Sequence, residues 1–135
     1  MPSRYRDALM ECCGGKLIVS LDFEGQCLTM HPLPYWQLVE EKLLSMPTLN
    51  PEARRLQRLI IGSSTEVEMD ANGRIAILPI LRAEVGIDKK IMLVGLGKKF
   101  EIWPEDVWKE NYQGWVGAGP VDTEKLPESI QELVF

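Results

Sequence analysis

An internal repeat limits how this chain can fold. In each of two segments, a short helical turn is followed by a strand, a turn, a second strand, a proline and a helix that carries a tryptophan. The tryptophan follows the proline by four residues in both, as Trp36 after Pro32 and as Trp108 after Pro104. One such unit is too small to bury a core by itself. We therefore expect two units that pack as a pseudo-symmetric pair.

The two units match strand by strand. The strand expected over 17–21 corresponds to the strand over 91–94, and the strand over 27–31 corresponds to the strand over 100–103. Short apolar runs bounded by glycine and proline are typical of buried strands. Helical periodicity and capping residues predict helices over 1–11, 34–44, 51–61, 80–85 and 104–112.

A hairpin pattern over residues 65–78 precedes the second unit. Its first strand alternates apolar and acidic residues, and an alternation of isoleucines resumes over 75–77. Asn72-Gly73 between them is typical of a type I′ turn, in which both central residues have positive φ. Pro79 ends the second strand because it has no N–H for a ladder. The pattern predicts a β-hairpin with Arg74 immediately after the turn.

No counterpart of this hairpin precedes Pro2. If the repeat is real, about 14 residues equivalent to 65–78 are missing from the first copy. Our hypothesis is that the chain is truncated by a downstream start at Met1. An upstream reading frame that encodes an Asp-x-x-Gly-Arg segment would support this hypothesis, and an in-frame stop just upstream would refute it.

Charge and length narrow the functional classes. The 135 residues carry a net charge of −5, and the pI is near 4.9. The tail over 121–135 has four acids against one lysine, so the other 120 residues carry only −2. The negative net charge argues weakly against a simple nucleic-acid binder, because such proteins usually carry an excess of basic residues. No apolar run approaches the ~18–20 residues that span a bilayer, and the N-terminus lacks the apolar region of a secretory signal.

Few residues favour catalysis or metal binding. Cys12 and Cys13 are adjacent, and none of the three cysteines forms a C-x-x-C pair, which favours reduced thiols. Cys27 and the single histidine, His31, could share a strand face, but no third orienting group accompanies this pair. We expect no enzyme, no metal, no cofactor and no small-molecule substrate.

A helix begins at Asn50, which is a good N-cap followed by proline, and we expect it to end at Gly62. Its buried stripe is expected to consist of Leu56, Leu59 and Ile60. The opposite side carries three arginines, Arg54, Arg55 and Arg58. Such a group is commonly a solvated helix face, and its functional alternative is a contact with phosphate or a partner.

Several segments together carry a family resemblance. In the second half these are Asp70-Ala-Asn-Gly-Arg74, Leu81-Arg82, Met92-Leu-Val-Gly95 and Phe100-Glu-Ile-Trp103. In the first half they are Pro2–Arg6, Leu28–Pro32 with Trp36, and Asn50–Arg55. In order and spacing they resemble the two SpoVT-AbrB repeats and the linker of the MraZ family. The resemblance implies an α+β fold with two tandem AbrB-like repeats of the swapped-hairpin (double-split β-barrel) type. A pseudo-two-fold axis would relate the two repeats.

The resemblance divides the chain into four parts. Residues 1–35 would be the first repeat, lacking its N-terminal hairpin, and 36–63 a helical linker. Residues 64–107 would be the second repeat, and 108–135 a C-terminal helix with the acidic tail. We expect a flexible hinge at Gly114–Pro120 within this last part.

The same resemblance implies a bacterial transcriptional regulator. Members of the family bind short direct repeats in promoter DNA as homo-oligomeric rings, at the division and cell-wall gene cluster. A cytoplasmic, nucleoid-associated repressor without a membrane anchor is therefore expected. In the family each repeat carries Asp-x-x-Gly-Arg, and the first copy is absent here. The expected DNA-contacting residues are those of the second copy, Asp70, Asn72, Gly73 and Arg74, with secondary contacts from Arg54, Arg55 and Arg58.

The residues leave two interpretations of Arg74 open. Its guanidinium can fork onto phosphate or guanine, or it can pair with Asp70 and only stabilise the turn. We expect Arg82 to be structural, through a carboxylate of the hairpin. At the level of the whole chain, the alternative to DNA binding is an oligomeric scaffold or partner-binding module that uses the tail and the helices of Trp36 and Trp108.

Overall fold

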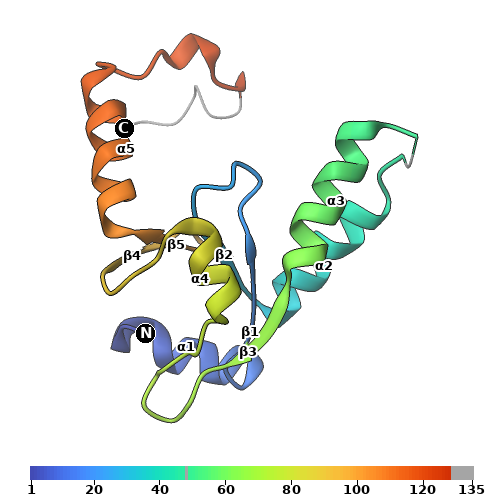
Figure 1. Cartoon of the computed structure of the whole chain (residues 1–135), viewed down its shortest axis with the longest axis vertical. Helices are drawn as coiled ribbons and strands as arrows, with labels where there is room; N and C mark the ends of the chain where they lie inside the picture. Colours follow the sequence, from blue (N-terminus) through green and yellow to red (C-terminus); the bar gives the residue numbers. More distant parts are fainter. Residues whose placement is uncertain (48, 129–135) are drawn as a thin grey trace. The chain divides into compact units, whose positions relative to one another are not determined.

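The computed structural model describes residues 1–47 and 49–128 (Figure 1). The chain divides into two compact units, Met1–Glu105 and Asp106–Phe135. The first unit contains α1 (Ser3–Cys13), β1 (Lys16–Leu21), β2 (Leu28–Pro32), α2 (Leu33–Leu44), α3 (Pro51–Ser63), β3 (Thr65–Glu68), α4 (Pro79–Val85), β4 (Ile91–Gly95) and β5 (Phe100–Pro104). After these come α5 (Glu105–Gly117) and the short 3₁₀ helix η1 (Thr123–Lys125). The predicted α+β class is confirmed.

One antiparallel sheet organises the first unit. Its five strands run in the order β3-β1-β2-β5-β4. The hairpin of β1 and β2 pairs Leu17 with Pro32, and the hairpin of β4 and β5 pairs Ile91 with Pro104. Their inner strands β2 and β5 pair with each other, so the two hairpins form a continuous sheet.

The main core lies on one face of this sheet. Alternate residues of β1 and β2 point into it because side chains alternate along a strand. Leu9 of α1 and both Leu81 and Val85 of α4 cover them. The strand residues in this core are Leu17, Val19, Leu28, Met30, Val67, Phe100 and Ile102. Every residue of β2 is buried, which agrees with its central place in the sheet.

Helices α2 and α3 lie side by side as a helical hairpin that contacts β1 (Figure 1). Gln57 of α3 donates a hydrogen bond of 2.6 Å to the carbonyl of Leu43, which ties the two helices together. Trp36 is only 3% exposed, and its Nε1 donates to Glu40 at 2.9 Å. Its ring packs 5.7 Å from that of His31, so Trp36 belongs to the buried interior.

Two predicted glycine breaks are wrong. Helix α3 continues through Gly62 to Ser63, and the side chain of its C-cap, Ser64, donates to the carbonyl of Ile61 at 2.7 Å. Helix α5 likewise continues through Gly114 to Gly117, so the expected hinge over 114–120 is helical in its first part. Neither Gly62 nor Gly114 has positive φ, and glycine without that requirement only weakens a helix.

The second unit is built on α5. The ring of Trp108 stacks on Tyr112 at 6.0 Å and meets Trp115 edge-on at 5.4 Å. These residues lie four and seven apart, so they share one helix face. The end of the acidic tail, residues 129–135, lies outside the described residues. In the described part of the chain, no helix is both long enough and apolar enough to cross a membrane.

Burial of His31 generates a prediction about pH. Burial, followed by the charge of Lys99, lowers the pKa of His31 from 6.5 to about 4. Between these values the unfolded chain binds a proton that the folded chain does not, so the free energy of unfolding should fall as the pH drops from 6.5 towards 4. Urea unfolding should show a shallower fall for His31→Gln than for the unmodified chain. Equal slopes would contradict this assignment.

Candidate functional site

The segment that follows β3 forms a tight turn, but not the predicted type. The N–H of Gly73 donates to the carbonyl of Asp70 at 3.0 Å, and the N–H of Asp70 donates to that of Arg74 at 3.0 Å. Gly73 has φ of 76°, whereas no non-glycine residue of the described chain, Asn72 included, has positive φ. The type I′ prediction is therefore wrong. The geometry matches a three-residue loop in which only the last residue is left-handed, and glycine suits that position.

Asp70 holds this turn through its carboxylate. Its Oδ1 accepts the backbone N–H groups of Asn72 and Arg74, each at 2.8 Å. The hydrogen bond from Arg74 is the main cause that lowers the pKa of Asp70, so the carboxylate stays ionised at neutral pH. Local structure thus explains why aspartate and glycine occupy their positions in Asp-x-x-Gly-Arg. One stabilises the turn, and the other permits its backbone conformation.

The side chain of Arg74 has a different status. It is exposed, and its backbone rather than its guanidinium bonds Asp70. Among the described residues the guanidinium has no hydrogen bond or ion pair, although its charge helps to lower the pKa of Asp70. The structure therefore does not contain the Asp70–Arg74 pair that was the alternative expectation.

The predicted second strand of the hairpin does not form. Residues 75–78 belong to no strand, and β3 pairs instead with β1. Met69 extends this ladder by donating to the carbonyl of Gly15 at 2.8 Å. Ile75 and Ile77 still pack against the core as partly buried side chains. The alternating isoleucines are therefore explained by their partial burial and not by a strand. The hydrogen-bonding partner of β3 is β1.

Arg6 is a residue of this site that sequence reasoning missed. Its guanidinium lies against Gly73, so closely that a Cβ at position 73 would come within 2.9 Å of its Cζ. Its Nη2 donates to the carbonyl of Met1 at 3.2 Å, and the amine of Met1 donates to the carbonyl of Gly73 at 2.8 Å. Met1 and Arg6 thus hold the turn from the N-terminal end of the chain. The repeat offered one signal, because Arg6 aligns with Arg82.

Arg82 is structural, but not in the way predicted. Its Nη2 donates to the backbone carbonyl of Asp88 at 3.1 Å rather than to a carboxylate of the hairpin. The bond ties α4 to the segment that leads into β4. The aligned arginines Arg6 and Arg82 therefore both bind backbone carbonyls, each close to its own helix.

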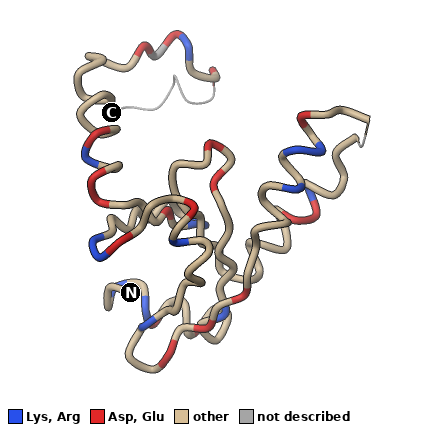
Figure 2. The backbone as a smooth tube through the Cα atoms, viewed as in Figure 1, with Lys and Arg blue, Asp and Glu red and all other residues tan. Residues whose placement is uncertain are grey.

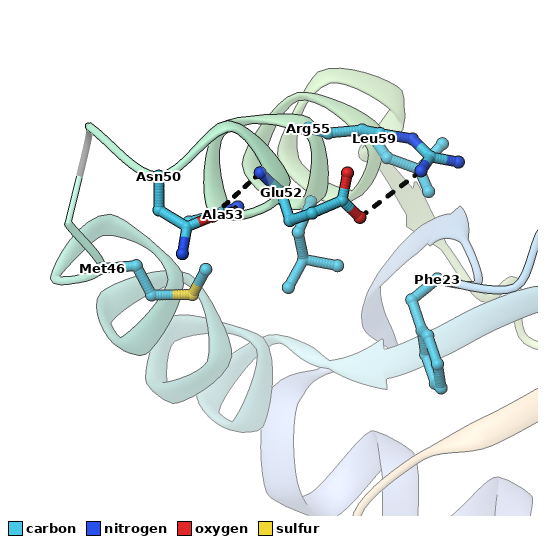
Figure 3. Close-up of a pocket in the computed structure, with 8 residues that line it drawn as sticks. Phe23, Met46, Asn50, Glu52, Ala53, Arg55 and Leu59 are labelled. Atoms are coloured by element: carbon cyan, nitrogen blue, oxygen red, sulfur yellow. Dashed lines mark hydrogen bonds and ion pairs between the residues drawn. The ribbon is translucent and has the colours of Figure 1, made fainter.

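The arginines of α3 lie apart from the turn, because β3 separates the two (Figures 1 and 2). All three are exposed, and Arg55 forms an ion pair of 3.5 Å with Glu52. Figure 3 shows this pair beside Asn50, whose Oδ1 accepts the N–H groups of Glu52 and Ala53. The adjoining pocket of about 420 Å³ is lined partly by Phe23, Met46, Leu56 and Leu59. The predicted N-cap is confirmed.

Cys27 does not form a dyad with His31 in the way that their spacing allowed. Its thiol lies with the carboxylates of Asp22 and Glu101, and the three potential ligand atoms are within 4.8 Å of one another. Burial, aided by these two carboxylates, raises the pKa of Cys27 to about 12, so the thiol is protonated. Asp22 accepts the N–H of Glu24, and Glu101 accepts Nε1 of Trp103, each at 3.2 Å. The cluster is a polar junction with Asp22 and Cys27 buried and Glu101 half-buried, and both carboxylates already accept hydrogen bonds.

The fold and this site define a class of protein. The chain is a small α+β protein whose sheet carries a tight, carboxylate-capped turn with an exposed arginine. A sequence profile of a family described as "MraZ protein, putative antitoxin-like" matches residues 60–114.

Relatives with the name "Transcriptional regulator MraZ" match most of the chain. The one from Pseudomonas aeruginosa PAO1 is 46% identical over 135 residues, which are 100% of this chain and 89% of the relative. The one from Thioalkalivibrio sulfidiphilus is 48% identical over 115 residues, 85% of this chain and 76% of the relative. The one from Halorhodospira halophila is 39% identical over 134 residues, 99% and 88% of the two chains. The chain belongs to the MraZ family.

The turn generates a prediction about Gly73. Alanine there should cost about 1–2 kcal/mol for the left-handed conformation, plus the cost of displacing Arg6. Gly97→Ala is the matched control, because Gly97 has φ of 78° but nothing lies within 4 Å of the point that its Cβ would occupy. Chemical denaturation should therefore show a larger loss of stability for Gly73→Ala than for Gly97→Ala. In an Arg6→Ala background the difference should disappear, and equal losses in the starting chain would refute the contact.

Proposed function

We propose that this chain is a sequence-specific DNA-binding transcriptional regulator and that Arg74 contacts the DNA. The observation that carries this proposal is the contrast within Asp70–Arg74. Asp70 caps the turn through its carboxylate, and Gly73 supplies the left-handed conformation that the turn needs. The Arg74 guanidinium, in contrast, is exposed on a fixed backbone and forms no hydrogen bond or ion pair within the described chain. A cation held in this way can fork onto guanine or phosphate with little loss of backbone freedom.

A second cation lies beside the turn. Arg6 of α1 contacts Gly73 and adds its positive charge to that of Arg74, whereas Glu66, Glu68 and Asp70 supply negative charge in the segment just before. Two neighbouring cations can bind phosphate even though the whole chain is acidic, because the effect of distant charges falls off over about 10 Å in salt. Arg54, Arg55 and Arg58 would be secondary contacts.

We further infer a tandem pair of AbrB-like repeats related by a pseudo-two-fold axis. The repeat aligns Leu17 with Ile91 and Pro32 with Pro104. In the structure Leu17 lies opposite Pro32 in the first hairpin, and Ile91 lies opposite Pro104 in the second, so the two hairpins have the same register. The inner strands are antiparallel with Thr29 opposite Glu101, two positions that are also aligned in the repeat. A two-fold axis between equivalent strands would produce this register. It would leave β4 as the equivalent of β1, with β3 added only to β1.

A homo-oligomeric ring would explain how an acidic chain with one such turn per subunit binds DNA. Several weak contacts gain by effective concentration when DNA repeats match the spacing of the subunits. The face of α5 is a reasonable subunit contact, since Tyr112 and Trp115 are each 52% exposed. Aromatic residues are enriched at such interfaces. We place the binding sites in direct repeats at the promoter of the division and cell-wall genes, with the protein acting as a nucleoid-associated cytoplasmic repressor.

The exposed aromatic face of α5 also favours a second candidate function, an oligomeric scaffold that binds partners without DNA. The buried Trp36 plays no part in it. Promoter binding in a mobility-shift assay, with competitor DNA and increasing salt, distinguishes the two. A regulator shows a specific shift, whereas a scaffold shows none.

Substitution of Arg74 tests the proposed contact. Arg74→Ala should weaken binding to promoter DNA by about 1–3 kcal/mol, while the free energy of unfolding stays nearly constant because the side chain is exposed. Lys89→Ala, which removes an exposed cation elsewhere, is the control and should bind as the starting chain does. Arg74→Lys separates the two forms of contact, because lysine preserves a phosphate contact but loses a bidentate contact with guanine. Unchanged binding by Arg74→Ala would refute the contact.

The ring hypothesis predicts a dependence on the number of DNA repeats. Fragments that carry one, two and three direct repeats should bind with increasing affinity, because each repeat engages another subunit of one oligomer. Fluorescence anisotropy at fixed salt measures these affinities, and light scattering gives the size of the complex. Scrambled repeats at the same spacing are the control. Equal affinity for one repeat and for three would contradict the ring hypothesis.

A further inference from the structure

A second pocket lies in the first unit, between α2 and the turn that joins β4 to β5. It has a volume of about 470 Å³, within the range of small-molecule sites. Tyr35, Leu38 and Val39 of α2 line one side, and Leu96 of the turn lines the other. Leu38 and Leu96 are 53% and 48% exposed, so the pocket presents apolar surface to solvent.

The charged residues of this pocket are of one sign. Lys42 of α2 and both Lys98 and Lys99 of the turn line it, and no acidic side chain belongs to the described lining. The Nζ of Lys98 sits 5.6 Å from the ring centroid of Tyr35, a cation–π contact that directs the amine over the pocket. Three ammonium groups around an apolar cavity make a site that favours a negative charge.

His31 provides an independent sign of a ligand. It lines the same pocket, is 8% exposed, and has a buried Nδ1 without a hydrogen-bond partner in the described structure. An unsatisfied buried polar atom costs about 1–3 kcal/mol. Because Nδ1 is shielded from solvent, a ligand oxygen would accept a hydrogen bond from Nδ1–H after a small movement of the side chains that cover it. Lys99 lies close enough for its charge to act on the imidazole, so one anionic group can be near both.

We propose that this lysine pocket binds a small amphipathic anion. Its phosphate or carboxylate group would lie between Lys42, Lys98 and Lys99, within reach of His31. Its apolar body would cover Leu38 and Val39. The lining of this pocket shares no residue with the turn at Arg74, so the proposed site does not depend on DNA binding.

The single histidine of the chain makes the test direct. The full chain is titrated at neutral pH with phenyl phosphate, benzoate, inorganic phosphate and benzyl alcohol. Proton NMR measures the chemical shifts of the His31 imidazole at each step. Phenyl phosphate or benzoate should shift the His31 resonances saturably, and which of the two binds more tightly identifies the preferred anionic group. Inorganic phosphate lacks the apolar ring, and benzyl alcohol lacks the negative charge. Each should therefore bind at least about tenfold more weakly, which corresponds to about 1.4 kcal/mol.

Variants assign the binding to the pocket. Lys42→Ala and Lys98→Ala should each weaken the preferred probe at least about fivefold, a loss typical of one charge-assisted hydrogen bond, whereas Lys89→Ala should not. Circular dichroism checks that each variant is folded. Equal binding of inorganic phosphate and phenyl phosphate would overturn the proposal, as would unchanged affinity in both pocket variants. A shift of His31 by promoter DNA but by neither aromatic anion would also overturn it, and would assign the lysines to the DNA backbone.

Discussion

The antiparallel pairing of β2 with β5 is the interaction on which the first unit depends. Each strand belongs to a local hairpin, and neither hairpin could bury both faces by itself. When Thr29 lies opposite Glu101, Leu28 meets Ile102 and Met30 meets Phe100, which brings apolar side chains from both hairpins into one core. A slip by one residue would turn these side chains to the opposite face. The register of this one strand pair therefore positions α1 and α4 as well.

The support of the turn after β3 follows from that sheet. Among the described strands β3 pairs with β1 alone, and the ladder ends where Met69 bonds Gly15. Beyond this point Asp70 caps the reversal through local bonds, and Arg6 and the amine of Met1 hold it from the start of α1. The turn is thus supported both by its own side chain and by a helix distant in sequence, while its arginine remains outside. Such a division between fixed backbone and exposed cation suits recognition of an anion.

The sequence predicted the parts that depend on neighbouring residues. The strands around Leu17 and Leu28, the helix capped by Asn50 and the hairpin that ends at Pro104 all formed where apolar runs and capping residues indicated. It failed where the answer depends on distant partners. Gly62 and Gly114 look like helix ends, yet both helices continue because nothing there requires a left-handed residue. Ile75 and Ile77 alternate like a strand, yet β3 pairs with β1, whose edge is set by the rest of the sheet.

The sequence by itself determined the α+β class of the fold, the residues that form most of its strands and helices, and the N-cap at Asn50, because periodicity and capping act over a few residues. Only the tertiary structure decided what those residues meet. It placed Arg6 against Gly73, grouped Cys27 with Asp22 and Glu101, and brought His31 to the same pocket as the lysines of a distant turn. These contacts join residues as far as 79 positions apart, the separation between Asp22 and Glu101. Their geometry depends on how the sheet and helices pack, which no local pattern encodes.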